Sequence, residues 1–260
     1  MNTLMTRMVN TTPWLTCYKP NPPARVRLFC FPYAGGSAAI FRNWHKHLPE
    51  YVEVCPVQLP GRSSHMSGPP FTNLAALIEP LARALRPYLD KPFAFFGHSM
   101  GAIISFELAR YLRKRFLPRP LHLFVSGRTA PQIPEEDPGD YDLPEPEFLQ
   151  RLRNLNGTPR EVMDHPELME LMIPLLRADF ALIQTYVYSP EPPLNIPITV
   201  FGGTEDTEVA QEHLEAWREQ TNSSFALRML SGDHFFLLNA ESQLLTLLDL
   251  QFSKHLLTAA

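Results

Sequence analysis

The stretch that decides the fold runs from residue 93 to residue 102 and reads FAFFGHSMGA. Its four apolar residues, 93–96, have strand character, and a helical pattern follows over residues 99–115. Between them, GHSMG matches the pattern G-x-S-x-G of a sharp turn that presents a nucleophilic serine. Side chains at the two glycine positions of such a turn would clash with the flanking strand and helix. The stretch therefore predicts that Ser99 is raised at the end of a strand, where the following helix begins.

Outward from this turn, the chain alternates between short apolar runs and helical patterns. We expect strands at residues 25–31, 52–58, 93–96, 121–126, 196–201 and 225–230, with a shorter one near 14–18. We expect helices at 37–47, 73–89, 99–115, 209–219 and 239–257, capped where Ser37, Thr72 or Asn73, and Asn239 allow. This rhythm predicts an α/β fold with a mostly parallel central sheet flanked by helices.

One segment, residues 128–190, interrupts the alternation. Its first part, 131–146, holds five prolines and several acidic residues, which indicates a loop. Helical patterns rich in Leu, Met and Phe follow at 147–155 and 166–188. We expect a single domain over residues 1–260, with 128–190 as a helical lid insertion over the carboxyl ends of the strands, where such sheets bind ligands. The alternative is ordinary helices packed on the sheet.

A serine nucleophile needs a base and an acid, which follow it in the order acid, then histidine, in hydrolases with this turn. His234, within SGDHFF after the last predicted strand, is the candidate base. Asp206, which follows the strand at 196–201, is the candidate acid that would orient the imidazole and stabilise its charged form. Glu205 and Glu208 are neighbouring alternatives to Asp206.

Two backbone N–H groups are candidates for stabilising an oxyanion. The Met100 amide lies at the start of the helix, where helical N–H groups lack partners. The Ala34 amide lies in FPYAGG, after the first predicted core strand, where small residues allow close approach of the backbone. The alternative for Ala34 is a plain tight turn. We expect His98 to shape the turn around Ser99.

Composition excludes several other classes of protein. The formal net charge is −4, which argues against nucleic acid as a partner. Three cysteines without a CxxC pair argue against a disulfide framework or a zinc site, and Cys30 and Cys55 fall in apolar runs where burial is expected. The sequence contains no P-loop, no GxGxxG and no cluster of metal ligands, so we predict no cofactor and no metal. Neither a signal peptide nor a membrane span is evident, so we expect a cytoplasmic protein without membrane contact. We also expect it to be a monomer.

Two further motifs leave alternatives open. Leu59-Pro60-Gly61-Arg62 closes a predicted strand, either as a structural turn or as a contributor near the site. A basic cluster at the end of the helix at 99–115 suits the helix dipole, and is either a solvated helix end or a docking patch for an acidic partner; its members are Arg110, Arg113, Lys114, Arg115 and Arg119.

Six motifs in one order resemble the type II thioesterases, the editing enzymes that work beside nonribosomal peptide and polyketide synthases. They are FPYAGG (31–36), LPGR (59–62), FGHSMGA (96–102), GTP (157–159), RAD (177–179) and GDHFF (232–236). The vertebrate medium-chain fatty acid synthase thioesterase belongs to the same group. The resemblance implies an α/β-hydrolase fold, with catalytic roles for Ser99, Asp206 and His234 and oxyanion roles for the Ala34 and Met100 amides.

The resemblance further implies hydrolysis of acyl thioesters on the phosphopantetheine arm of acyl or peptidyl carrier proteins, which removes stalled or aberrant acyl groups. Because the same residues support other acyl-transfer chemistry, three alternatives stay open. These are a carboxylesterase or lipase that acts on free esters, an acyltransferase or cyclase, and a non-catalytic module that binds carrier proteins.

Overall fold

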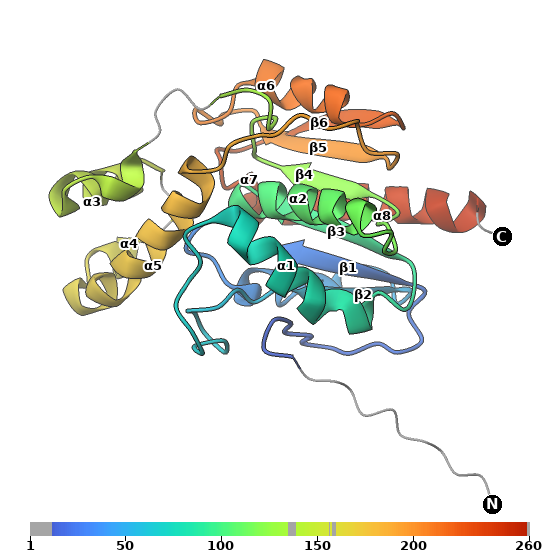
Figure 1. The fold of residues 1–260 in the computed structure, drawn as a ribbon, viewed down its shortest axis with the longest axis horizontal. Coiled ribbons are helices and arrows are strands. Elements are labelled where there is room, and N and C mark those ends of the chain that lie inside the picture. The colour runs from blue at the N-terminus through green and yellow to red at the C-terminus, as the bar shows by residue number, and fades with distance from the viewer. Residues whose placement is uncertain (1–11, 135–138, 156, 158–159, 259–260) are drawn as a thin grey trace, which may run out of the picture.

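The computed structural model describes residues 12–134, 139–155, 157 and 160–258, and its centre is a six-stranded parallel sheet (Figure 1). The strand order is β2-β1-β3-β4-β5-β6, and every neighbouring pair is parallel. The strands are β1 (Val26–Phe31), β2 (Val52–Pro56), β3 (Phe93–His98), β4 (Leu123–Ser126), β5 (Ile198–Gly203) and β6 (Phe225–Leu230). The mostly parallel sheet predicted from the sequence is confirmed. The segment at 14–18 forms only an isolated antiparallel bridge, between Leu15 and Val57.

Helices cover both faces of the sheet, so its central strands are buried on both sides. Figure 1 shows α1 (Leu74–Leu85) and α2 (Met100–Lys114) in front of the sheet and α8 (Glu241–Thr258) behind it. Alternate residues of β3 serve the two sides: Phe93 and Phe95 pack in the core of the α2 face, whereas Ala94 and Phe96 pack in the core of the other face. The remaining helices of this scaffold are α6 (Gln211–Glu215) and α7 (Phe236–Asn239).

Several helices have boundaries that differ from the predicted ones. Instead of one helix over 37–47, there are two 3₁₀ turns, Ala38–Phe41 and Trp44–Lys46, with Ser37 capping the first. The two buried aromatic residues there, Phe41 and Trp44, end the first turn and begin the second. Both pack on Phe96, with ring centroids 6.1 and 4.9 Å away. Asn73, not Thr72, caps α1, and α8 begins at Glu241, so Asn239 does not cap it.

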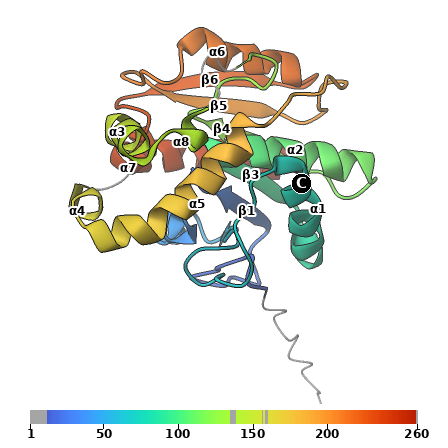
Figure 2. The same ribbon diagram turned by 60° about the vertical axis from the view of Figure 1, so that its left-hand side comes forward.

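Among the described residues between β4 and β5, three α-helices are called the insertion below: α3 (Glu145–Leu155), α4 (Arg160–Met163) and α5 (Pro166–Gln184). They project beyond the carboxyl ends of the strands (Figures 1 and 2). They have a small core of their own, made of Phe148, Leu152, Met163, Met169, Ile173 and Leu176. The predicted helix at 166–188 ends earlier, at Gln184, and the chain returns to β5 through residues 185–197, called the connector below.

Candidate active site

Ser99 lies in the turn between β3 and α2, in a strained backbone conformation. Its φ is 51° and its ψ is −112°, values that residues other than glycine rarely adopt. A Cβ on Gly97 would lie 2.1 Å from the Gly101 carbonyl oxygen, and a Cβ on Gly101 would lie 2.1 Å from that of Phe31. The Ser99 N–H donates to the Ser126 carbonyl over 2.8 Å, which ties the turn to β4. The glycines of the motif thus allow a turn that no larger residue could form.

His234 and Asp206 meet in the loops that follow β6 and β5. The distance from His234 Nδ1 to Asp206 Oδ2 is 2.9 Å, and the Asp206 side chain is fully buried. The other Asp206 oxygen, Oδ1, accepts from the Glu208 and Val209 amides over 2.8 and 3.2 Å. Of the three neighbouring acids, Asp206 is therefore the one in contact with the histidine. Glu205 is exposed, and Glu208 pairs with Arg151 of the insertion, Oε2 to Nη2, over 2.7 Å.

The two candidate oxyanion donors come from two different segments of the scaffold. Met100 is the buried first residue of α2, directly after Ser99, and Ala34 follows β1, the neighbour of β3 in the sheet. Among the described residues, no turn, loop or cap hydrogen bond uses either of these backbone N–H groups. Both positions are therefore compatible with donation to a ligand.

His98 is completely buried beneath the candidate base. Its ring centroid is 5.2 Å from that of His234, and its Nδ1 is 2.8 Å from the Ser126 hydroxyl. Burial, with the nearby charge of His234 as a second cause, holds the pKa of His98 well below the ordinary value. A neutral His98 therefore packs in the turn, as predicted from its position.

Ser99 and His234 line one pocket at the carboxyl ends of the strands. Its empty volume is about 860 Å³, open solvent included. One wall comes from the scaffold and includes Tyr33, Ala34 and Phe235, whereas the opposite wall comes from the insertion; its members there are Arg151, Leu152, Leu155, Leu176, Phe180, Ile183 and Gln184. A ligand next to Ser99 would therefore lie between apolar and polar side chains.

A turn of this geometry, a histidine–aspartate pair and a shared pocket are the parts of a serine hydrolase. The thioesterase domain model matches residues 26–251. The chain belongs to the thioesterase family. It is 47% identical over 251 residues to linear gramicidin dehydrogenase LgrE of Brevibacillus parabrevis, covering 95% of each chain. It is 46% identical over 241 residues to the gramicidin S biosynthesis protein GrsT of Aneurinibacillus migulanus, covering 93% of this chain and 94% of GrsT.

Among solved structures, the type II thioesterase BorB from the borrelidin biosynthetic cluster is 34% identical, with a TM-score of 0.84 and 92% and 97% of the two chains covered. LgrE carries the word dehydrogenase in its name, whereas the family model and BorB are both thioesterases. The α/β-hydrolase fold and the resemblance to type II thioesterases are therefore confirmed, and the protein is a thioester hydrolase.

The LPGR motif of this thioesterase contacts α5, a helix that lines the pocket, in addition to forming a turn. Arg62 is buried and forms two hydrogen bonds with Asp179 of α5, Nη1 to Oδ2 at 2.7 Å and Nη2 to Oδ1 at 2.6 Å. The sequence motifs LPGR and RAD thus meet through their charged members. Sequence reasoning singled out both motifs but did not pair them. The sequence offered one signal for this pairing: LPGR carries a cation, Arg62, RAD carries an anion, Asp179, and neither motif had an assigned role.

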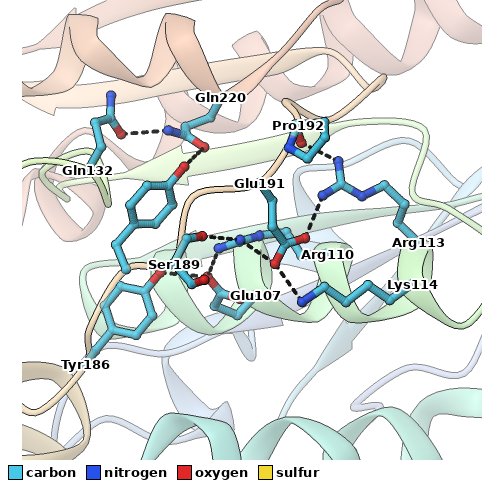
Figure 3. A network of polar contacts seen from close by, with 11 residues as sticks. Glu107, Arg110, Arg113, Lys114, Gln132, Tyr186, Ser189, Glu191, Pro192 and Gln220 are labelled. Atoms are coloured by element: carbon cyan, nitrogen blue, oxygen red, sulfur yellow. Dashed lines mark hydrogen bonds and ion pairs between the residues drawn. The ribbon is translucent and has the colours of Figure 1, made fainter.

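Most of the basic cluster at the end of α2 binds the connector, which gives these residues a role within the chain (Figure 3). Glu191 pairs with Arg110, Arg113 and Lys114, at 2.8 Å from Arg113 and 2.6 Å from Lys114. Arg113 also donates to the Pro192 carbonyl over 2.6 Å. The cluster therefore fastens the return of the chain from the insertion onto the helix that begins after Ser99.

The described residues offer neither a cluster of metal ligands nor a membrane-spanning helix. Within the described ranges, no group of three or more His, Cys, Asp or Glu side chains is arranged to hold a metal ion. None of the helices among those residues is long and apolar enough to cross a membrane. The motif Gly157-Thr158-Pro159 lies mostly outside the described residues, which include only its glycine.

Proposed function

We propose that this thioesterase releases acyl groups from the phosphopantetheine arm of acyl or peptidyl carrier proteins, with Ser99 as nucleophile, His234 as general base and Asp206 as the acid that orients it. The observation that carries the proposal is the 2.9 Å contact between His234 Nδ1 and buried Asp206, in a histidine that lines the same pocket as Ser99. This contact holds the Nδ1 proton and leaves Nε2 to accept the proton of Ser99.

In the first step, Ser99 Oγ attacks the thioester carbonyl while His234 takes its proton. The carbonyl oxygen becomes an oxyanion, for which the Ala34 and Met100 amides are the proposed donors. The carbon–sulfur bond then breaks, and protonated His234 returns a proton to the departing thiolate. A thiol with a pKa near about 8.5 is a good leaving group. The products of this step are an acyl ester on Ser99 and the free arm.

In the second step, water attacks the acyl-Ser99 ester. His234 takes one proton from the water, the same two amides receive the oxyanion, and Ser99 leaves with the proton from His234. The products are a carboxylic acid and the regenerated enzyme. Every proton moves through His234, so no cofactor is required by this sequence of steps.

The choice of carrier-bound substrates is supported by the relatives. GrsT is a gramicidin S biosynthesis protein and BorB is a type II thioesterase of a biosynthetic cluster. We further propose that the insertion acts as a lid over the acyl group, which is supported by the seven insertion residues in the pocket wall. A cytoplasmic location is consistent with three cysteines that are all free thiols.

The test is hydrolysis of acetyl-, medium-chain acyl- and aminoacyl-carrier proteins by the wild type and by Ser99→Ala. We expect turnover by the wild type and a loss of about a millionfold in the variant. Mass spectrometry of the products checks that the acyl group leaves as a free acid and not as an amide or a second ester. Equal inactivity on every carrier, with free esters cleaved by the wild type, would show an esterase instead. Transfer of the acyl group to an amine or alcohol would show an acyltransferase.

A further inference from the structure

The buried ion pair between Arg62 and Asp179 contacts the loop that carries Ala34, in addition to joining LPGR to α5. The Gly35 N–H donates to Asp179 Oδ2 over 2.7 Å, and Arg62 Nη1 donates to the Gly36 carbonyl over 3.1 Å. The side chains of Arg62 and Asp179 are only 4% and 1% exposed. The pair therefore binds a backbone donor and a backbone acceptor in the two residues directly after Ala34.

Gly35 is fixed from a second direction by the same helix. Its φ is +75°, and a Cβ there would lie 2.5 Å from Leu176 Cδ2. Leu176 and Asp179 are three residues apart on α5, so they lie on one face of the helix. Backbone at positive φ is available to glycine at little cost, which lets α5 pack directly on the loop. One face of α5 therefore supplies both an apolar and a charged contact to this loop.

Burial of two charges is not a good way to hold a fold together, because an apolar pair of similar volume is often as stable. An apolar pair, however, could not bind a backbone N–H and a backbone carbonyl at defined positions. The hydrogen-bonding geometry of Arg62 and Asp179 suits orientation of the loop better than it suits stability alone. An oxyanion donor needs such orientation, since displacement of a reacting group by about 1 Å can cost 100-fold in rate.

We infer that Arg62 and Asp179 are positioning residues that set the direction of the Ala34 N–H toward the oxyanion. This inference rests on the proposed function, because it assigns Ala34 the oxyanion role. It also gives α5 a second task besides lining the pocket. The helix would hold one half of the oxyanion site from the insertion, while the Met100 half belongs to the scaffold.

The test compares Asp179→Asn with Glu53→Gln. Glu53 is a matched control because it is also a buried carboxylate that pairs with one arginine, Arg27, and accepts one loop N–H, that of Asn21. Its pair joins β1 and β2, away from the residues that line the pocket. The readouts are thermal stability, kcat and KM for an acyl-N-acetylcysteamine thioester, and the affinity of a trifluoromethyl ketone, whose adduct with Ser99 carries an oxyanion.

We expect Asp179→Asn to lower kcat by about 10- to 100-fold with little change in KM, and to weaken the ketone by a similar factor. We expect Glu53→Gln to lose comparable stability while it keeps its kcat. Wild-type kcat and ketone affinity in folded Asp179→Asn would overturn the inference, and so would an equal loss of kcat in Glu53→Gln.

A second variant covers the case in which Asp179→Asn does not fold. Arg62→Lys keeps a cation beside Asp179 but removes the paired hydrogen bonds, and we expect a smaller loss of kcat with unchanged KM. Wild-type kcat in folded Arg62→Lys would then overturn the inference. Failure of the proposed function has a different signature, namely thioester hydrolysis that is absent in the wild type or retained in Ser99→Ala.

Discussion

The two walls of the pocket are held in place by different means. The scaffold wall stands on strands that are buried on both faces, within two large apolar cores. The insertion has a core of six buried residues, and it is joined to the scaffold both by Leu182 and Ile183 of α5, which pack in the core of the α2 face, and by charged contacts that it and its connector make. These contacts are Arg62 with Asp179, Arg151 with Glu208, and Glu191 with Arg110, Arg113 and Lys114.

The difference distinguishes contacts that contribute most of the folding free energy from contacts that orient particular groups. Apolar burial contributes most of the free energy of folding and tolerates little change of shape. Partly exposed ion pairs contribute only about 0–1 kcal/mol each, but they fix which groups face one another. Arg151, with 33% of its side chain exposed, belongs to this second class. We therefore expect changes in the scaffold to have large effects and changes at the insertion contacts to have smaller ones.

The largest effect should be a loss of kcat in Asp206→Asn, and Glu208→Gln is the variant with which it is compared. The first change removes the carboxylate that holds His234, within the scaffold, and should lower kcat by about ten-thousandfold. The second removes one of the two carboxylate partners of Arg151 at the pocket wall, the other being Asp140, and should lower kcat less than about fivefold. Steady-state kinetics on one acyl thioester measures both. Similar losses in the two variants would contradict the comparison and would reopen the choice between these acids.

The next effect concerns stability and compares Gly101→Ala with Gly139→Ala. A Cβ on Gly101 would lie 2.1 Å from the Phe31 carbonyl oxygen, whereas one on Gly139, before the insertion, would meet nothing within 4 Å. We expect Gly101→Ala to lose at least about 3 kcal/mol of unfolding free energy. Gly139→Ala should lose about 1 kcal/mol, from its φ of +154° alone. Urea denaturation measures both, and a tolerated Gly101→Ala would show that the turn can relax.

The third effect, which is small near neutral pH and grows as the pH falls, is a dependence of scaffold stability on pH. His122 is buried between β4 and β5, with Nε2 2.8 Å from the Thr199 hydroxyl, and burial lowers its pKa to about 3. Unfolded histidine has a pKa near about 6.5, so as pH falls the unfolded chain takes up this proton first. The stabilisation present above that pH should therefore decline toward pH 3, by about 1.4 kcal/mol per pH unit.

The check is urea denaturation at several pH values below 6.5 for His122→Gln and for His165→Gln at the exposed start of α5. We expect a reduced slope of stability against pH in the first variant and the wild-type slope in the second. Some slope should remain in His122→Gln, because the pKa values of His98 and His255 are also lowered. An unchanged slope in His122→Gln would contradict the prediction.

Much of the scaffold could be predicted because its signals are local. The alternation of apolar runs and helical patterns gave the strands, and the steric demand of Gly97 and Gly101 gave the turn at Ser99. Asp206 and His234 could be proposed because loops after neighbouring parallel strands open on the same edge of the sheet. Each of these residues could be located from the short strand and loop that carry it, without knowledge of a contact to a distant side chain.

The contacts that join the insertion to the scaffold could not be predicted, because they link residues far apart in the chain. Arg62 and Asp179 are separated by 117 positions, and Arg151 and Glu208 by 57. Charge alone could not pair them, since the chain offers 23 Lys and Arg and 27 Asp and Glu. The single helix expected at 37–47 is also wrong, and the residues there, Phe41 and Trp44, pack on Phe96, a contact that a local sequence pattern does not reveal.

The separate core of the insertion has a consequence for the history of the protein. Its six residues share no member with the two cores of the scaffold. A substitution among the six changes the insertion's own packing and leaves the residues of the two scaffold cores unaltered. Leu152 and Leu176 belong to this core and also line the pocket. A lineage of such enzymes can therefore acquire new substrates through drift in this small module, with Leu176 the constrained member because it also packs on Gly35 beside a proposed oxyanion donor.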